Sequence, residues 1–127
     1  TSFDAYQRAK LAIVTYTRWL ASRLSANAPT VVAICPGLTD TPLLRASFPG
    51  MTGQPVADAV ENVFAGITGD APSGTYMHDG SVGDPNPLAD QPAVQARLIA
   101  STEAMLGVSL EEAFPAIEGD LTHLHGR

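Results

Sequence analysis

A continuous apolar run that ends at a Pro-Gly pair constrains the fold of this chain more than any other feature. Residues 30–35 read Thr-Val-Val-Ala-Ile-Cys, and Pro36-Gly37 follows at once. Because apolar residues do not alternate with polar ones, we expect a strand that is buried on both faces, as in a parallel sheet between two helix layers. Proline cannot continue a central strand, so the strand should end at Cys35.

Helical patterns lie on both sides of this strand. Residues 1–26 carry apolar side chains on nearly every side, which predicts a first helix buried on more than one side and ended by Asn27-Ala28-Pro29. Beyond the strand we expect helices at 42–47, 54–68 and 91–106, a strand at 74–78 closed by Asp79-Gly80, and a loop at 81–90. This order predicts an α/β fold with a parallel sheet and right-handed crossovers. Two strands do not make a stable sheet of this kind, so the pattern indicates half of a domain.

The composition narrows the class of protein. Of the 127 residues, 45% are hydrophobic, which is enough to build a core. The net charge is −6 and the few basic residues are scattered, which argues against nucleic-acid binding. No apolar run approaches the roughly 20 residues of a membrane span, and the single cysteine fits a reducing cytoplasm. We expect a cytoplasmic protein without a membrane span, and the start at Thr1 rather than Met indicates a truncated piece.

Two pairs of residues are candidates for chemistry. Tyr6 and Lys10 lie four apart on the first predicted helix, so their side chains share one face, and Lys10 is the only lysine of the chain. The alternative is an ordinary solvated helix face. Thr39 and Thr41 follow Pro36-Gly37 at the carboxyl end of the predicted strand, the edge where open α/β sheets bind ligands. The alternative is that Pro-Gly simply ends the strand.

Taken together, the Tyr-x-x-x-Lys helix, the β-branched strand and Pro-Gly-x-x-x-Thr resemble the short-chain dehydrogenase/reductase family. Residues 6–12 resemble its active-site helix, and residues 35–37 resemble its strand end. Residues 74–76 and 87–89 and the last helix are similar to the retinol-dehydrogenase-like branch. The resemblance spans residues 4 to 107 and implies the carboxyl-terminal part of a Rossmann-like doubly wound parallel sheet. Residues 1–107 would form this half-domain, and 108–127 a weakly structured tail.

The resemblance implies an NAD- or NADP-dependent oxidoreductase that transfers hydride between nicotinamide and a small-molecule carbonyl or secondary alcohol. Tyr6 would be the general acid/base. A tyrosine phenol in water has a pKa of about 10. An ammonium ion about 4 Å away favours the phenolate by roughly 4 kcal/mol at an effective dielectric constant of about 20. Lys10 would exert this effect and also bind the nicotinamide ribose.

Further roles follow from the same resemblance. Pro36 and Gly37 would belong to the cofactor site. Thr39, through its backbone, and Thr41 would hold the nicotinamide carboxamide. The helix over residues 4–26 would make a homo-oligomer interface.

The chain also departs from the family. No glycine-rich dinucleotide fingerprint is present, because Gly50, Gly53, Gly66 and Gly69 have neither its spacing nor a preceding strand. Ser2 lies too close to Tyr6 to be the family's catalytic serine, and the helix that supplies its active-site asparagine is absent. The alternative is therefore a catalytically incomplete piece that acts only in binding or dimerisation.

The remaining candidates are weaker. His78, His123 and His125 have no cysteine or carboxylate cluster nearby, so we predict no metal site. Cys35 should be a small buried hydrophobic residue. The apolar loop residues could either cover an apolar substrate or simply pack the loop down; they are Leu43, Leu44, Phe48 and Met51.

Overall fold

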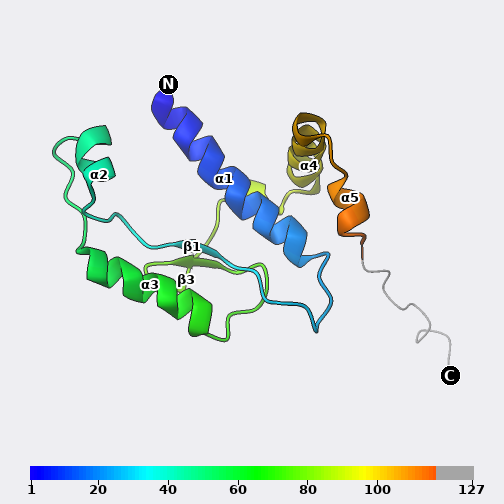
Figure 1. Cartoon of the computed structure of the whole chain (residues 1–127), viewed down its shortest axis with the longest axis horizontal. Helices are drawn as coiled ribbons and strands as arrows, with labels where there is room; N and C mark the ends of the chain where they lie inside the picture. Colours follow the sequence, from blue (N-terminus) through cyan, green and yellow to red (C-terminus); the bar gives the residue numbers. More distant parts are fainter. Residues whose placement is uncertain (117–127) are drawn as a thin grey trace.

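The computed structural model of this protein describes residues 1–116, which alternate between helices and short strands (Figure 1). The fold is mixed α/β, as predicted. The elements follow in the order α1 (Ser2–Ala21), β1 (Ala33–Cys35), α2 (Pro42–Ser47), α3 (Val56–Thr68), β2 (Tyr76–His78), β3 (Ser81–Val82), the 3₁₀ helix η1 (Pro87–Asp90), α4 (Pro92–Leu106) and α5 (Leu110–Ala113).

The sheet has three strands in the order β1-β2-β3. β1 and β2 are parallel, with Ala33 opposite Tyr76 and Cys35 opposite His78. α1 lies on one face of the sheet and α3 on the other (Figure 1). Gly66 of α3 allows a close approach, since a Cβ there would collide with the side chain of Ile34. The predicted layering of helices on both faces is therefore confirmed for β1.

A wholly parallel sheet is wrong for the third strand. β3 pairs with β2 in the antiparallel direction, through a turn formed by Asp79 and Gly80. Both turn residues have positive φ, 48° and 75°, which is the conformation of a two-residue hairpin whose twist matches the strands. The predicted loop at 81–90 is consequently wrong at β3 and at η1. Asp-Gly is itself a strong signal for a two-residue hairpin as well as for the end of a strand.

α1 begins and ends at identifiable caps. The Thr1 hydroxyl accepts a hydrogen bond from the Asp4 N–H at 3.2 Å, and the Asp4 side chain accepts one from the Thr1 amino group at 3.0 Å. The helix ends at Ala21, five residues before the predicted end. Ser22 follows, and its hydroxyl donates to the Trp19 carbonyl at 2.6 Å. Such a side-chain bond competes with the helical ladder, which accounts for the early end.

The core lies around the second half of α1. Thr15, Thr17 and Trp19 are buried there, whereas residues 1–10 are exposed. The predicted burial of the first helix on more than one side is therefore not found for residues 1–10 within the described part of the chain. The two buried threonine hydroxyls each donate to the carbonyl four residues earlier at 2.9 Å. Other elements supply the remaining buried apolar side chains, which are Ala33, Leu44, Ala59, Met77, Ala89 and Ile99.

Prolines and glycines predicted the other helix boundaries well. α2 has its predicted bounds, α3 begins directly after Pro55, and α4 ends at Gly107, whose φ of 66° is left-handed. Residues 108–116, predicted as part of a weakly structured tail, include α5. The Phe114 ring meets Trp19 edge-on at 6.4 Å. Among the described residues, no helix is long and apolar enough to cross a membrane.

Candidate functional site

A cavity of about 490 Å³ lies between α1, the carboxyl end of β1 and the segment that follows β3. It is predominantly apolar with a few polar groups at its wall, as ligand sites commonly are. Its lining residues are Tyr6, Gln7, Lys10, Leu11, Ile13, Val14, Ala33, Ile34, Cys35, Pro36, Gly37, Tyr76, Asp84, Pro85 and Asn86. The structure thus brings together four of the six predicted site residues: Tyr6, Lys10, Pro36 and Gly37.

Tyr6 and Lys10 project from adjacent turns of the exposed half of α1. The Lys10 Nζ lies 5.4 Å from the centroid of the Tyr6 ring. The Tyr6 ring also packs against two phenylalanine rings, with a distance between ring centroids of 6.5 Å to Phe3 and 6.4 Å to Phe48. Tyr6 is 51% exposed, so water screens the field of the ammonium at the phenol. The ammonium of Lys10 thus lies over the ring of Tyr6, on a surface that is open to solvent.

The Pro36-Gly37 turn forms the opposite wall. Gly37 has φ +90°, which favours glycine, and a Cβ there would collide with the Asp79 carboxylate and lie 2.6 Å from Gln54 Nε2. The absence of a side chain at this position is therefore required by local packing. Gly37 and Pro36 both line the cavity.

Thr39 and Thr41 are not part of the cavity wall. The Thr39 hydroxyl donates to the Gly37 carbonyl at 3.1 Å, and its backbone pairs with Gln54 in an isolated parallel bridge. The Thr41 hydroxyl caps α2 by accepting from the Leu44 N–H at 3.2 Å. Both hydroxyls thus hold the loop after the turn, and neither lines the cavity.

The cavity is also lined by several residues that were not among the predicted site residues, notably Tyr76, Asp84 and Asn86. Tyr76 stands opposite Ala33 in the parallel ladder, and paired residues point to the same face, so strand pairing could have found it. Burial, and then the neighbouring Cys35, raise the pKa of the Tyr76 phenol above its ordinary value. Cys35 is only half-buried and lines the cavity, in contrast to the expected buried residue.

The apolar loop after Thr41 divides between the two alternatives. Leu44 is buried and packs the loop down, whereas Leu43 is 75% exposed. Phe48 contacts the Tyr6 ring, as described above, and also meets Phe3 edge-on at 6.2 Å. This contact places one apolar loop residue beside the candidate acid/base, the position that a substrate-covering residue would need.

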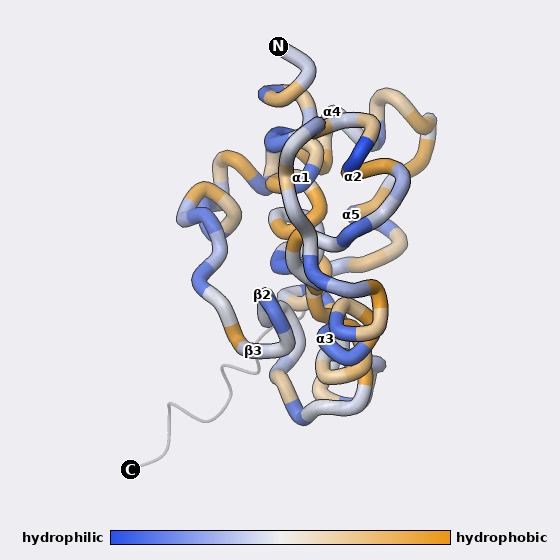
Figure 2. The backbone as a smooth tube through the Cα atoms, turned by 90° about the vertical axis from the view of Figure 1, so that its left-hand side faces the viewer, coloured by the Kyte–Doolittle hydropathy of each residue, from blue (hydrophilic) through white to orange (hydrophobic). Residues whose placement is uncertain are grey.

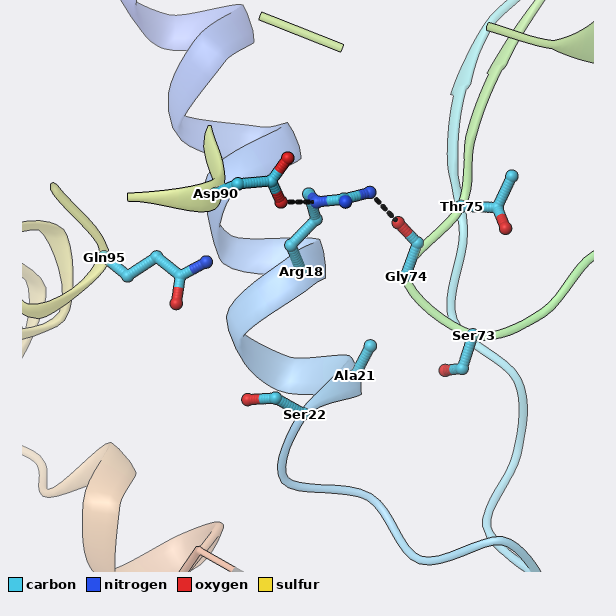
Figure 3. Close-up of a pocket in the computed structure, with 8 residues that line it drawn as sticks. All are labelled: Arg18, Ala21, Ser22, Ser73, Gly74, Thr75, Asp90 and Gln95. Carbon is cyan, nitrogen blue, oxygen red and sulfur yellow. Dashed lines mark hydrogen bonds and ion pairs between the residues drawn. The ribbon is translucent and has the colours of Figure 1, made fainter. Parts of the chain in front are cut away.

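A second, polar cavity of about 350 Å³ lies near the amino end of β2 (Figure 3). The Pro36-Gly37 turn is at the other end of these parallel strands, where β1 finishes. Arg18 of α1 occupies its centre. The guanidinium pairs with Asp90 of η1, and its Nη1 donates to the Gly74 carbonyl at 3.0 Å. Arg18 thus joins α1 to η1 and to the segment that leads into β2, so this cavity lies at a structural junction.

Residues 1–116 contain no cluster of three or more His, Cys, Asp and Glu side chains that could hold a metal ion. The Nδ1 of His78, at the end of β2, lies 3.3 Å from the Oδ2 of its neighbour Asp79. His123 and His125 fall outside the described residues. A scan against models of protein families, a search of curated proteins and a search of solved structures found no match to this chain.

Proposed function

We propose that this chain supplies one wall of the active site of an NAD(P)-dependent oxidoreductase of the short-chain dehydrogenase/reductase type. One observation carries the proposal: the Tyr6–Lys10 pair and the Pro36-Gly37 turn, 26 residues or more apart in sequence, line a single cavity. Acid–base side chains that share a cavity with the turn at the carboxyl end of a parallel strand are suited to binding and reducing a carbonyl compound.

The residues present fit a nicotinamide dinucleotide at this wall. Gly37 lines the cavity, and the side chains of Asp79 and Gln54 fill the space where its Cβ would lie. Lys10 offers an ammonium group to ribose hydroxyls. A bound reduced nicotinamide supplies the hydride. Tyr6 donates its phenolic proton to the substrate oxygen as the carbonyl is reduced, and takes the proton back from the alcohol in the reverse direction. Lys10 stabilises the phenolate that remains on Tyr6.

A second function, that of an assembly piece without chemistry of its own, is favoured by the exposed apolar surface. Val56, Val60, Phe64 and Ile67 of α3 are each about half exposed or more, and apolar residues recur along α3 (Figure 2). Phe3 and Ile13 are similarly exposed on α1. β1 has a neighbouring strand on one side only among residues 1–116. These surfaces are suited to association with another chain or with further secondary structure.

Single substitutions in the protein as expressed from its natural gene test the catalytic proposal. Tyr6→Phe removes the proton donor and keeps the ring, so turnover of carbonyl substrates with NAD(P)H should fall by far more than about tenfold, with cofactor binding retained. Tyr16→Phe is the matched control on the same helix, since Tyr16 does not line the cavity and stacks on Trp19 at 5.8 Å. Tyr6→Phe activity within about tenfold of the parent excludes Tyr6 as the acid/base.

Lys10→Met and a titration of the chain alone complete the test. Lys10→Met should weaken cofactor binding as well as turnover, and unchanged cofactor affinity would contradict the ribose contact. We expect the isolated 127-residue chain to show no measurable NAD(P)H binding, as followed by the fluorescence of Trp19, because the chain lacks the glycine-rich fingerprint that would hold the rest of the dinucleotide. Tight binding by the isolated chain would show that the site is more complete than proposed.

A further inference from the structure

The side chain of Asn62 reaches from α3 to the carboxyl end of β1. Its Nδ2 donates a hydrogen bond to the Pro36 carbonyl oxygen at 2.9 Å. The amide of Gln54 donates to the same oxygen, and the two amides lie 3.5 Å apart, from Asn62 Nδ2 to Gln54 Oε1. Pro36 therefore has its carbonyl held by two donors that come from different segments of the chain. Pro36 lines the Tyr6–Lys10 cavity, whereas neither amide residue does.

Asn62 also packs against the turn between β2 and β3. A Cβ at Gly80 would lie 2.8 Å from Asn62 Oδ1, so the side chain fills the space that this glycine leaves. The Asp79 carboxylate of the same turn fills the space where a Cβ of Gly37 would lie. One partly buried amide thus sits where the chain leaves β1 and where it leaves β2, and it joins the two turns at the edge of the sheet.

The orientation of one peptide group follows from these contacts. The described chain has no cis peptide bonds, and in a trans peptide the C=O and the following N–H point in opposite directions. Asn62 and Gln54 hold the Pro36 oxygen on their own side, so the Gly37 N–H is directed away from them. α3 and α1 lie on opposite faces of the sheet (Figure 1), and the cavity is on the α1 side.

We propose that Asn62, together with Gln54, is a positioning residue that fixes the Pro36–Gly37 peptide in the wall of the Tyr6–Lys10 cavity. Its consequence for cofactor binding rests on the proposed function, because the wall it holds is the one assigned to the nicotinamide. Asn62 does not touch the cavity and acts through the Pro36 carbonyl.

The positioning is tested by NMR spectroscopy of the full 127-residue chain, without any ligand. Asn62→Asp keeps the shape of the side chain and replaces the donor by a carboxylate, which the Pro36 oxygen repels. We expect the Pro36 carbonyl and Gly37 amide resonances to move. Asn27→Asp is the same chemical change at an exposed loop position and should leave both in place. Unmoved resonances in Asn62→Asp overturn the proposal. If that variant does not fold, Gln54→Glu removes the second donor and is judged by the same resonances.

Kinetics of the natural gene product test the functional consequence separately. Asn62→Asp should raise the KM for NAD(P)H by about tenfold, the loss of roughly one hydrogen bond, with kcat nearly unchanged because Tyr6 is untouched. A general structural defect would lower kcat as well. Moved resonances with an unchanged KM overturn the link to the cofactor. If the parent protein binds no nicotinamide, the proposed function fails, and the Gly37 resonance alone decides whether Asn62 positions the turn.

Discussion

The phenol and ammonium of the candidate site lie on an exposed turn of α1. Tyr6 is half exposed, and its ring packs against Phe3 and Phe48. An ion pair or cation–π contact in water contributes little, because solvent screens the charge. Efficient acid–base catalysis therefore requires that this face be covered, by substrate, cofactor or further protein. Gly37 differs from the pair, because its conformation and its contacts with Asp79 and Gln54 are already set by packing.

Tyr76 provides a prediction at the scale of a single ionisation. Its pKa is raised by burial and by Cys35, so the folded chain keeps this phenol neutral at a pH where the unfolded chain, with a pKa of about 10, ionises. The contribution of Tyr76 to stability is thus present below about pH 10 and is lost as pH rises through the raised folded pKa. In a tyrosinate absorbance titration, Tyr76→Phe should remove the ionisation above the ordinary tyrosine range.

Tyr16→Phe is the control for this titration. It should leave the high-pH ionisation of Tyr76 in place, because Tyr16 packs on Trp19 away from the cavity. A high-pH ionisation that persists in Tyr76→Phe would contradict the assignment.

At the scale of elements, the sheet is held between helices by a few close contacts. Gly66 allows α3 to approach Ile34 of β1. On the other face, Arg18 ties α1 to η1 and to Gly74, two residues before β2 (Figure 3). Arg23 of the segment after α1 pairs with Glu111 of α5 and lies over the Trp19 ring at 5.0 Å. These contacts connect segments that are far apart in the chain.

Gly66→Val tests the packing of α3 on the sheet. The added side chain would meet Ile34, including its Cγ1 within 2.8 Å of the new Cβ, so the free energy of unfolding should fall by about 1–3 kcal/mol. Thr68→Val adds valine to an exposed position of the same helix and should change stability by less than about 0.5 kcal/mol. Urea denaturation of both variants measures the difference. Equal stability of the two would mean that α3 does not pack closely on β1.

At the scale of the whole molecule, apolar surface remains uncovered on both helix layers. The first half of α1 and the outer side of α3 are exposed, and β1 lies at the edge of the sheet. A buried parallel strand in the usual α/β architecture has neighbours on both sides. The arrangement is therefore well suited to association, which both candidate functions require.

Sedimentation velocity over a concentration series tests association through α1. We predict self-association of the 127-residue chain, and Ile13→Lys should shift it towards the monomer because it places a charge on the exposed apolar side of α1. Met105→Lys is the matched control, since Met105 is 85% exposed on α4. Two results would exclude α1 as the interface: an unsubstituted chain that stays monomeric, or an equal shift towards the monomer in Ile13→Lys and Met105→Lys.

Local patterns in the sequence were sufficient to predict most of the elements. The α/β class, the strand that ends at Cys35 and the bounds of α2 follow from apolar runs and from proline positions. The register of Tyr6 and Lys10 on one helix face follows from helical geometry. Each of these depends on neighbours within a few residues. The early end of α1 and the Asp79-Gly80 hairpin are also local features. The first depends on the bond from the Ser22 hydroxyl to the Trp19 carbonyl, and the second on the hairpin preference of Asp-Gly.

Other features depend on residues that are distant in the chain, and only the tertiary structure decided them. Tyr76 and Asp84 join the cavity through strand pairing and through the path of the chain after β3. The hydroxyls of Thr39 and Thr41, two residues predicted to contact a cofactor, hold the loop and cap α2. The amide of Asn62 meets the Pro36 carbonyl because α3 packs beneath β1. The sequence by itself determined which residue types stand near each strand end, because helix and strand periods are local; packing determined which of them meet, because contact requires a shared place in three dimensions.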